Sequence, residues 1–225
     1  MRKLIASLFS VAALMLVAAT PAVAGSPKGF CQSGGVNKVV LADAMAKYWS
    51  WYYGGVGSQE IGRLYLVPLP NGEPISDDPL IFQGSASFTV RTGRTLVLPM
   101  QFYLGESYVE GPPDDPASFP VDLKASSLLL TVDGRVVVDS TRTKLDCVYI
   151  DVTYFEEPIF YPEPSSYGSN AAIWMTGLGI LLPPMSPGSH IIEMQVIAPY
   201  APLFGVDFGY YNTWHVTVEA PRRHH

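Results

Sequence analysis

The chain has 225 residues and a formal net charge of -6, with 48% apolar and 15% charged residues. It contains 20 Gly and 20 Pro, together about 18% of the chain, which is below the roughly 25–30% typical of compositional disorder. These values exclude a disordered or low-complexity chain. They favour one folded domain, and all-β domains commonly reach this length as a single unit.

The first 24 residues have the pattern of a secretory leader. Arg2 and Lys3 precede an apolar run over residues 4–19, and residues 21–24 end in the small-x-small pattern of a cleavage site. The run has about 16 residues, whereas a membrane span needs roughly 20. We therefore predict a signal peptide over residues 1–24 and a single domain over residues 25–225. The mature protein is expected to be secreted or periplasmic, with no membrane span after leader removal.

The charge distribution bears on the class of partner. Removal of the leader takes away two basic residues and no acidic one, which leaves 12 Lys and Arg against 20 Asp and Glu, a balance of -8. No Lys or Arg occurs between Leu145 and Pro221. Binding to nucleic acid requires clustered cations that neutralise phosphates, so nucleic acid is excluded as an expected partner.

The two cysteines, Cys31 and Cys147, both lie in the part of the chain expected to be exported. An oxidising compartment favours their pairing, and we predict a disulfide bond between them. A catalytic thiol is the alternative, but it would need a partnered His in an electropositive pocket.

One helix is predicted near the N-terminus of the mature chain. Over residues 37–53, the side chains of Leu41, Met45, Tyr48 and Tyr52 recur at helical spacing, which indicates an amphipathic helix that ends at the following glycine pair. Both tyrosines are expected to be buried with this stripe.

The rest of the chain has the short period and dense turn signals of strands. An Asp133-Gly134 pair between two Val-rich and Leu-rich runs predicts a two-residue hairpin turn. We predict a mainly β fold, an antiparallel sandwich or jelly roll of about nine strands with one N-terminal amphipathic helix. Long loops are expected at residues 105–120 and 156–170. The expected strands are residues 61–66, 86–91, 95–104, 125–132, 135–139, 145–154, 172–182, 190–197 and 213–219.

A succession of five blocks in the sequence resembles a family of exported bacterial proteins of unknown function. The resemblance implies an exported all-β unit and no particular activity. Its blocks are the aromatic pair Trp49 and Trp51, the segments 88–99, 132–134 and 179–192, and the closing segment 214–218.

Few residues have the spacing of a catalytic or metal site. No Gly-x-Ser-x-Gly motif is present, and before the C-terminal tail the mature chain has only His190 and His215. We therefore predict no transition-metal site. Calcium stays an alternative, because the loop pairs Asp77-Asp78 and Asp114-Asp115 offer oxygen ligands, although each pair precedes a proline, as is common in turns.

Aromatic side chains are the main candidates for binding. Since a helix buries only one side, at least one of Trp49 and Trp51 is expected to be partly exposed. We predict a binding platform that includes these two residues, Tyr53 and Trp214. The expected function is a non-catalytic binding or interaction protein with no cofactor, whose partner is a glycan or another exported protein. The alternative is a hydrolase that acts on an extracellular polymer through a carboxylate pair drawn from Asp151, Glu156, Glu157 and Glu163.

Overall fold

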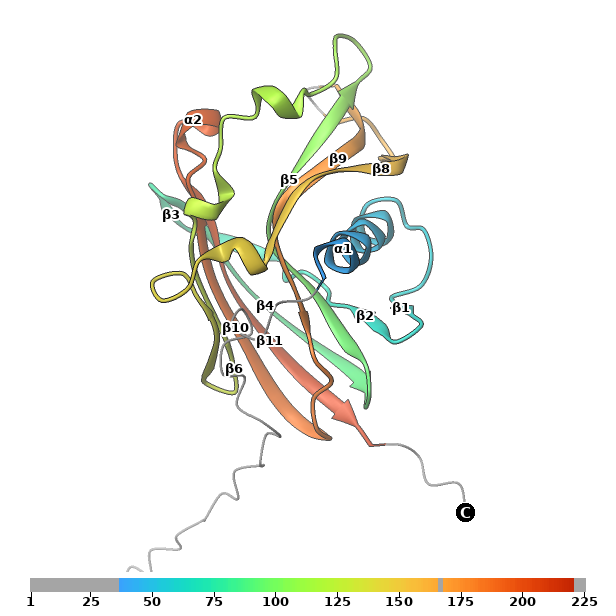
Figure 1. Ribbon diagram of the computed structural model, residues 1–225, viewed down its shortest axis with the longest axis vertical. Helices are drawn as coiled ribbons and strands as arrows, with labels where there is room; N and C mark the ends of the chain where they lie inside the picture. Colours follow the sequence, from blue (N-terminus) through green and yellow to red (C-terminus); the bar gives the residue numbers. More distant parts are fainter. Residues whose placement is uncertain (1–36, 166–167, 221–225) are drawn as a thin grey trace, which may run out of the picture.

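The structure is a computed structural model that describes residues 37–165 and 168–220, and its fold is mainly β, as predicted (Figure 1). Two α-helices and three short 3-10 helices accompany the strands: α1 (Lys38–Tyr52), α2 (Ala201–Phe204), η1 (Pro116–Ser118), η2 (Leu123–Ala125) and η3 (Leu145–Cys147). The strands in the described residues are β1 (Glu60–Ile61), β2 (Leu64–Leu66), β3 (Gly72–Asp77), β4 (Leu80–Arg91), β5 (Thr95–Tyr108), β6 (Ser127–Val132), β7 (Arg135–Asp139), β8 (Tyr149–Phe160), β9 (Ser169–Leu182), β10 (Gly188–Ala198) and β11 (Phe208–Glu219).

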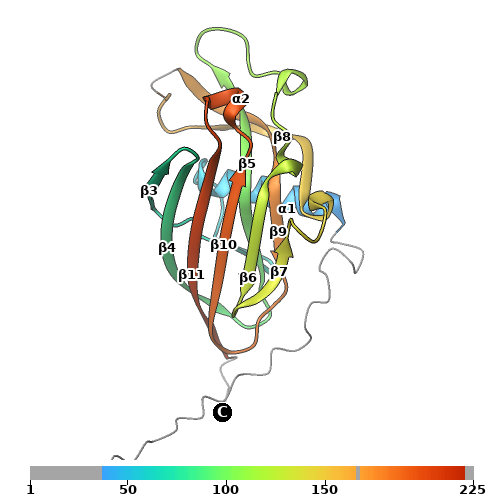
Figure 2. The same ribbon diagram turned by 90° about the vertical axis from the view of Figure 1, so that its left-hand side faces the viewer.

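The strands form two sheets. One has the order β1-β2-β5-β9-β8, and the other has the order β3-β4-β11-β10-β6-β7, which faces the viewer in Figure 2. The expectation of purely antiparallel pairing is wrong, because β4 pairs with β11 and β2 pairs with β5 in parallel. Side-chain alternation has the same period of two in either direction, so the sequence pattern does not report strand direction.

The strand count is eleven in the described residues instead of about nine. One difference is β3, which contains Pro74 and a register shift and has no run of β-branched residues. The other is the predicted strand at residues 61–66, which is divided by a turn at Gly62, whose φ is 59°. The structure also extends strands into both predicted loops, since β5 reaches Tyr108 and β8 reaches Phe160.

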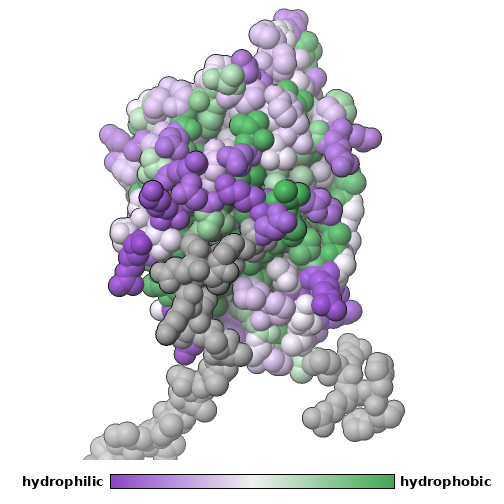
Figure 3. Space-filling model, viewed as in Figure 1, coloured by the Kyte–Doolittle hydropathy of each residue, from purple (hydrophilic) through white to green (hydrophobic). Residues whose placement is uncertain are grey.

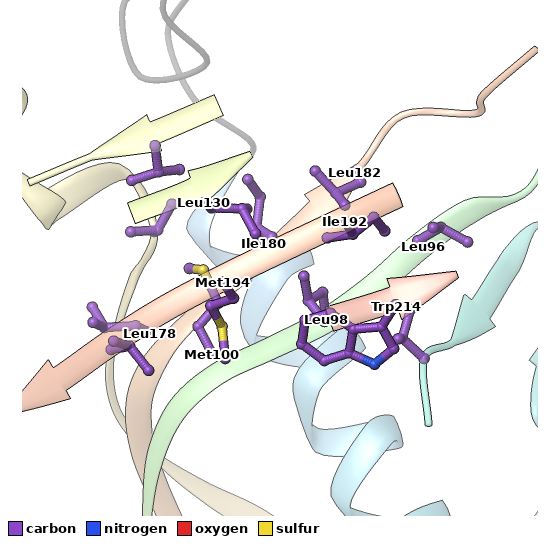
Figure 4. Close-up of a cluster of buried hydrophobic side chains, with 14 of the residues drawn as sticks. Leu96, Leu98, Met100, Leu130, Leu178, Ile180, Leu182, Ile192, Met194 and Trp214 are labelled. Carbon is purple, nitrogen blue, oxygen red and sulfur yellow. The ribbon is translucent and has the colours of Figure 1, made fainter. Parts of the chain in front are cut away.

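The main core lies between the two sheets (Figure 4). Side chains from β5 and β9 in one sheet meet side chains from β6, β10 and β11 in the other. Trp214 is fully buried there, and its indole Nε1 donates to the carbonyl oxygen of Pro68 at 2.8 Å. This position corrects the expectation that Trp214 belongs to an exposed platform. The core residues labelled in Figure 4 are Leu96, Leu98, Met100, Leu130, Leu178, Ile180, Leu182, Ile192, Met194 and Trp214.

Helix α1 covers the outer face of the five-stranded sheet, and Figure 1 shows it beside β5, β8 and β9. The Asn37 side chain caps its N-terminus by accepting from the Val39 N–H at 3.0 Å. The Tyr48 hydroxyl donates to the carbonyl oxygen of Val67 at 2.7 Å, and burial raises the pKa of this phenol. This sheet is therefore covered on both faces, which explains the nearly continuous apolar run of β9.

The predicted hairpin joins β6 and β7 and is confirmed. Asp133 and Gly134 have φ values of 52° and 71°, the left-handed conformation that a two-residue primed turn requires. The Asp133 carboxylate also holds β10: Oδ1 accepts from the Ile191 N–H at 2.9 Å, and Oδ2 lies 2.7 Å from Nδ1 of His190. The other ring nitrogen of His190 lies 2.8 Å from the carbonyl oxygen of Ser186.

In the described residues, no helix is both long enough and apolar enough to cross a membrane. On the face shown in Figure 3, apolar groups appear where α1 lies in Figure 1, among many hydrophilic residues. The exposed apolar side chains of this helix include Val39 and Val40, which lie in its first turn.

Candidate binding cleft

A cleft of about 1140 Å³ opens where the two sheets separate. Figure 1 shows the sheets close together at the lower end of the molecule and diverging toward the end that carries α2. We call this space the aromatic cleft, because eleven of its lining residues are aromatic. Its volume exceeds the roughly 300–1,000 Å³ of typical small-molecule sites, so it has room for an extended ligand.

The upper part of β5 brings the two walls of the cleft together. β2 pairs with β5 only over residues 95–97, so beyond Val97 the structure shows β5 paired with β9 alone. A register shift between Pro99 and Gln101 then changes which side chains point inward. Met100 packs in the core between the sheets, whereas Phe102 packs with the α1 cluster on the outer face. Both faces of this strand therefore line the cleft.

One wall is formed by aromatic rings around the C-terminal end of α1. The indole of Trp49 stacks on the ring of Tyr53 with centroids 5.6 Å apart, and it contacts Phe102 edge to face at 5.3 Å. Tyr53 contacts Tyr161, which follows β8, at 5.5 Å. Trp49 is buried, whereas Tyr53 is 39% exposed, so the outer ring of the stack is the accessible one.

The opposite wall comes from α2 and β11. The hydroxyl of Tyr200 donates to the carbonyl oxygen of Phe102 at 3.1 Å, which ties the two walls together at one point. Phe208 contacts Tyr200 at 6.2 Å and Tyr210 at 5.0 Å between ring centroids. Burial raises the pKa of Tyr200 to about 12, although the side chain of Gln101 opposes the shift, and burial raises the pKa of Tyr210 to about 12. Both phenols are therefore neutral at physiological pH.

A half-buried carboxylate, that of Asp114, braces the loop that follows β5 at one end of the cleft. Asp114 accepts hydrogen bonds from the hydroxyls of Tyr108 and Tyr103 at 2.9 and 3.2 Å and from the Glu106 N–H at 2.9 Å. Its carbonyl oxygen accepts from the indole of Trp174 at 2.9 Å. Burial and the nearby Asp114 raise the pKa of Tyr103. The carboxylate is thus engaged in organising the loop after β5.

Two buried polar atoms of the lining have no hydrogen-bond partner among the described residues: Oε1 of Gln101 and Nε1 of Trp49. Gln101 is 3% exposed and Trp49 is 6% exposed. A buried polar group without a partner costs about 1–3 kcal/mol, and such groups are rare in native proteins. One of these atoms is an acceptor and the other is a donor, and neither is accessible from the cleft in this structure.

The charged side chains of the described lining are Glu106 and Glu163, and no Lys, Arg or His is among them. Oε1 of Glu106 accepts a hydrogen bond from the Tyr161 hydroxyl at 2.8 Å. Of the four acids expected to supply a hydrolytic pair, only Glu163 lines the cleft. Asp151 is exposed on β8, where it pairs with Lys38 at 3.5 Å.

The structure does not bring the four predicted aromatic site residues together at one site. Trp49 and Tyr53 line the cleft, while Trp51 is half-buried outside the lining and contacts Tyr48 at 5.7 Å. The burial of Tyr48 is confirmed, but the burial expected for Tyr52 is wrong, since it is 43% exposed. The last turn of α1 extends to the cleft, so Tyr52 borders this space while its ring stacks on Tyr48.

The predicted disulfide includes a residue outside the described part of the chain, namely Cys31. Cys147 is half-buried at the end of η3 and packs against the main core. The pairing of the two residues therefore stays a prediction.

The calcium alternative rests on two aspartate pairs. Asp114 has the hydrogen bonds given above, and Asp115 caps η1 by accepting from the Ala117 N–H at 2.9 Å. The pair that begins at Asp77 lies at the β3–β4 turn. Over the described ranges, no three His, Cys, Asp or Glu side chains come together as a metal site.

Sequence reasoning missed the β5 and β8–β9 contributions to the cleft. Gln101 was detectable as a lone amide inside the otherwise apolar run of residues 96–104, but its burial next to a cleft depends on the register shift. Tyr200 and Phe208 lie in a segment rich in aromatic residues, and that density was their only signal.

Comparisons with known proteins add no family. No family model matches the chain, and no curated protein matches it. A solved structure described as "Solution Structure of Amebosin" aligns over 60% of this chain and 97% of its own, with 15% sequence identity and a TM-score of 0.20. At that score the similarity supports no conclusion about fold or function.

Proposed function

We propose that this protein is a non-catalytic binding protein whose ligand occupies the aromatic cleft. The observation that supports this most is a cleft of about 1140 Å³ lined by eleven aromatic residues, of which Tyr52, Tyr53 and Phe204 are 43%, 39% and 61% exposed. A ligand that enters the cleft would pack against these exposed rings and remove their apolar surface from water.

The cleft favours binding over hydrolysis. Its two carboxylates are Glu106 and Glu163, and Glu106 is already engaged with Tyr161. A hydrolase that acts on an extracellular polymer would instead release product during a binding experiment.

Export, the sandwich classification and the family resemblance are also part of the proposal. The predicted leader supports export to the periplasm or the cell exterior. The two facing sheets with a shared core support classification as a β-sandwich, and the resemblance of the sequence blocks supports membership of an exported bacterial family.

The proposal is tested with Nile red, a neutral dye whose fluorescence reports an apolar environment. We expect saturable binding to the wild type and at least tenfold weaker binding to Leu104→Trp, because Leu104 is half-buried in the lining and a larger side chain would fill the space. Phe204→Ala is a second variant that should bind Nile red more weakly, because it removes an aromatic ring from the lining. Phe204 is 61% exposed, so its truncation is expected to preserve the fold.

The matched control is Val136→Trp, which places the same bulky side chain on β7, where Val136 is 43% exposed and outside the lining. This variant should bind Nile red like the wild type. Absence of saturable binding, or equal binding by all variants, would overturn the proposal. Release of new reducing ends from an added polysaccharide would support the hydrolase instead.

A further inference from the structure

The aromatic cleft carries negative charge and no positive charge in its described lining. Glu106 of β5 is half-buried there, Glu163 after β8 is exposed, and no Lys, Arg or His is among the described lining residues. Neither glutamate side chain is fully buried, so a ligand in the cleft lies in the field of both carboxylates.

The segments that build this end of the molecule add no basic residue. Lys and Arg are missing from residues 64–90, 95–123 and 145–220, and these three segments supply every lining residue outside the C-terminal end of α1. The same segments hold most of the acidic residues of the chain. The cleft therefore lies in a region of negative potential, which attracts cations and repels anions.

Two lysines on neighbouring elements are already engaged and lie outside the lining. Lys47 of α1 pairs with Asp43 at 2.7 Å, and Nζ of Lys124 in η2 lies 3.6 Å from a carboxylate oxygen of Asp146. The ammonium group of Lys124 also lies 4.7 Å from the ring centroid of Tyr149. A cation thus packs over a tyrosine ring elsewhere in this fold, while neither lysine neutralises the cleft.

Accessible aromatic rings of the cleft offer faces to a cation. Tyr53 at the end of α1 is 39% exposed, and Phe204 on the opposite wall is 61% exposed. The ring of Tyr161 contacts that of Tyr53 with centroids 5.5 Å apart and planes tilted by 59°, and its hydroxyl donates to Glu106 at 2.8 Å. An aromatic corner and a carboxylate therefore meet at one place in the lining. Aromatic faces attract cations that lie within about 6 Å of the ring centroid.

The uncharged part of the lining selects among cations. Burial raises the pKa of Tyr200 and that of Tyr210 to about 12, so both phenols stay neutral. A strongly hydrated cation, such as a primary ammonium or a metal ion, would lose much of its hydration on entering a largely aromatic space, whereas an alkylated or delocalised cation is weakly hydrated. The volume of about 1140 Å³ leaves room for an apolar body attached to the charged group.

A basic peptide that adds as a strand to β5 is the competing occupant. The register shift next to Met100 interrupts the regular edge of this strand, and both backbone groups of Glu106 are bonded to Asp114. The Phe102 carbonyl oxygen accepts from Tyr200. Few main-chain groups are left for strand pairing, and bulged, blocked edges are poor templates for addition.

We infer, on the basis of the binding function proposed above, that the aromatic cleft binds an organic cation with an apolar body, of the class of quaternary ammonium compounds. Glu106 and Glu163 supply the opposite charge, and Tyr53 and Tyr161 form the corner that receives the cationic group. Phe204 packs against the apolar body from the opposite wall.

The test compares Nile red with Nile blue, which has the same fused ring system but carries a positive charge at neutral pH. We expect Glu106→Gln and Glu163→Gln each to weaken Nile blue binding at least threefold, and the double variant at least tenfold, with Nile red binding unchanged. Gln at position 106 keeps an acceptor for the Tyr161 hydroxyl, so the fold is expected to be preserved. Raising NaCl from about 0.02 to 0.5 M should weaken Nile blue binding at least threefold and should not weaken Nile red binding.

The matched control is Glu193→Gln on the exposed face of β10, which removes the same charge outside the lining and should bind both dyes like the wild type. Benzyltriethylammonium should displace Nile blue at concentrations at least tenfold below those at which the anion benzenesulfonate does.

The outcomes separate the ligand class from the binding function. If Nile red binds saturably but Nile blue binding responds neither to the two glutamate variants nor to salt, the inferred class is wrong and the cleft remains a binding site. If neither dye binds, the proposed function also fails. An equal loss of Nile blue binding in Glu193→Gln, or displacement of this dye by oligolysine and not by benzyltriethylammonium, would overturn the assignment.

Discussion

The hydrogen bonds of His190 predict a specific pH dependence of stability. Its Nδ1 lies 2.7 Å from a carboxylate oxygen of Asp133 and its Nε2 lies 2.8 Å from the carbonyl oxygen of Ser186. Both partners are acceptors, so both ring nitrogens donate only when the imidazole is protonated. Burial lowers the pKa of His190, but the hydrogen bonds to these two residues and the Asp133 charge outweigh it, and the pKa is raised above its ordinary value.

The sign of the effect follows from this raised pKa. A group whose folded-state pKa lies above its unfolded value near 6.5 stabilises the fold fully below that pH, and the contribution disappears as the pH rises through the folded-state pKa. We therefore expect the free energy of unfolding of the wild type to fall as the pH rises from about 6.5 through the folded-state pKa of His190.

Asp133→Asn is the informative perturbation. Asn tolerates the left-handed backbone at this turn, where φ is 52°, and it can still accept from the Ile191 N–H. It loses the charge-assisted bond to His190. Such a bond contributes about 1.5–3 kcal/mol, and the Asp133 side chain is 25% exposed, so the lower part of that range applies. A loss of about 2 kcal/mol at pH 6 corresponds to a decrease in Tm of roughly 4–8 °C for a domain of this size.

Urea unfolding at several pH values between 6 and 9 measures this effect. The Asp133→Asn variant should show a smaller difference in stability from the wild type at pH 9 than at pH 6. His215→Gln is the control, because His215 is exposed on β11. If the wild type and Asp133→Asn lose stability in parallel across this range, the assignment of a protonated His190 is wrong.

Three further predictions concern the two cysteines, the packing of Gly105 and the hydrogen bonds of Asp114. Thiol titration of the denatured, unreduced protein should find no free thiol, because Cys31 and Cys147 are expected to pair in an oxidising compartment, and two reactive thiols per chain would contradict this. Gly105→Ala should destabilise the protein by about 3 kcal/mol in urea unfolding, because an added Cβ would overlap the indole of Trp174; a change below 1 kcal/mol would refute that packing. Asp114→Ala should make residues 105–120 more susceptible to limited proteolysis, since three hydrogen bonds to its carboxylate are lost, and unchanged cleavage would show that the brace is dispensable.

Local signals predicted the parts of the fold that depend on neighbouring residues. The helical spacing of residues 37–53 coincides with α1, and the Asp133-Gly134 pair forms the expected turn, because period and positive φ are local properties. Strand direction and sheet order depend on contacts between distant segments. The full-length parallel pairing of β4 with β11 joins strands more than 100 residues apart, and no local pattern encodes it.

The cleft was less predictable than the fold, for a physical reason. Trp49 and Trp214 are chemically alike in sequence, yet one borders the cleft and the other fills the core between the sheets. What separates them is where the sheets diverge and where the register shift at Met100 turns the face of β5. Aromatic density therefore indicated which segments matter, but tertiary geometry determined which rings are accessible.

Buried polar side chains of this fold differ in how well they are paired. Thr176 donates to the carbonyl oxygen of Ile150 at 2.9 Å, and His190 uses both ring nitrogens, whereas the hydroxyl oxygens of Ser169 and Ser186 have no partner among the described residues. Gln101 is buried to a similar degree, yet its Oε1 has no partner among the described residues. Met at this position would fill a similar volume without an unsatisfied acceptor, so a core selected for stability alone favours Met. We therefore expect Gln101→Met to leave the free energy of unfolding unchanged or to raise it in urea unfolding, and a loss of more than about 1 kcal/mol would show that the amide makes a net stabilising contribution.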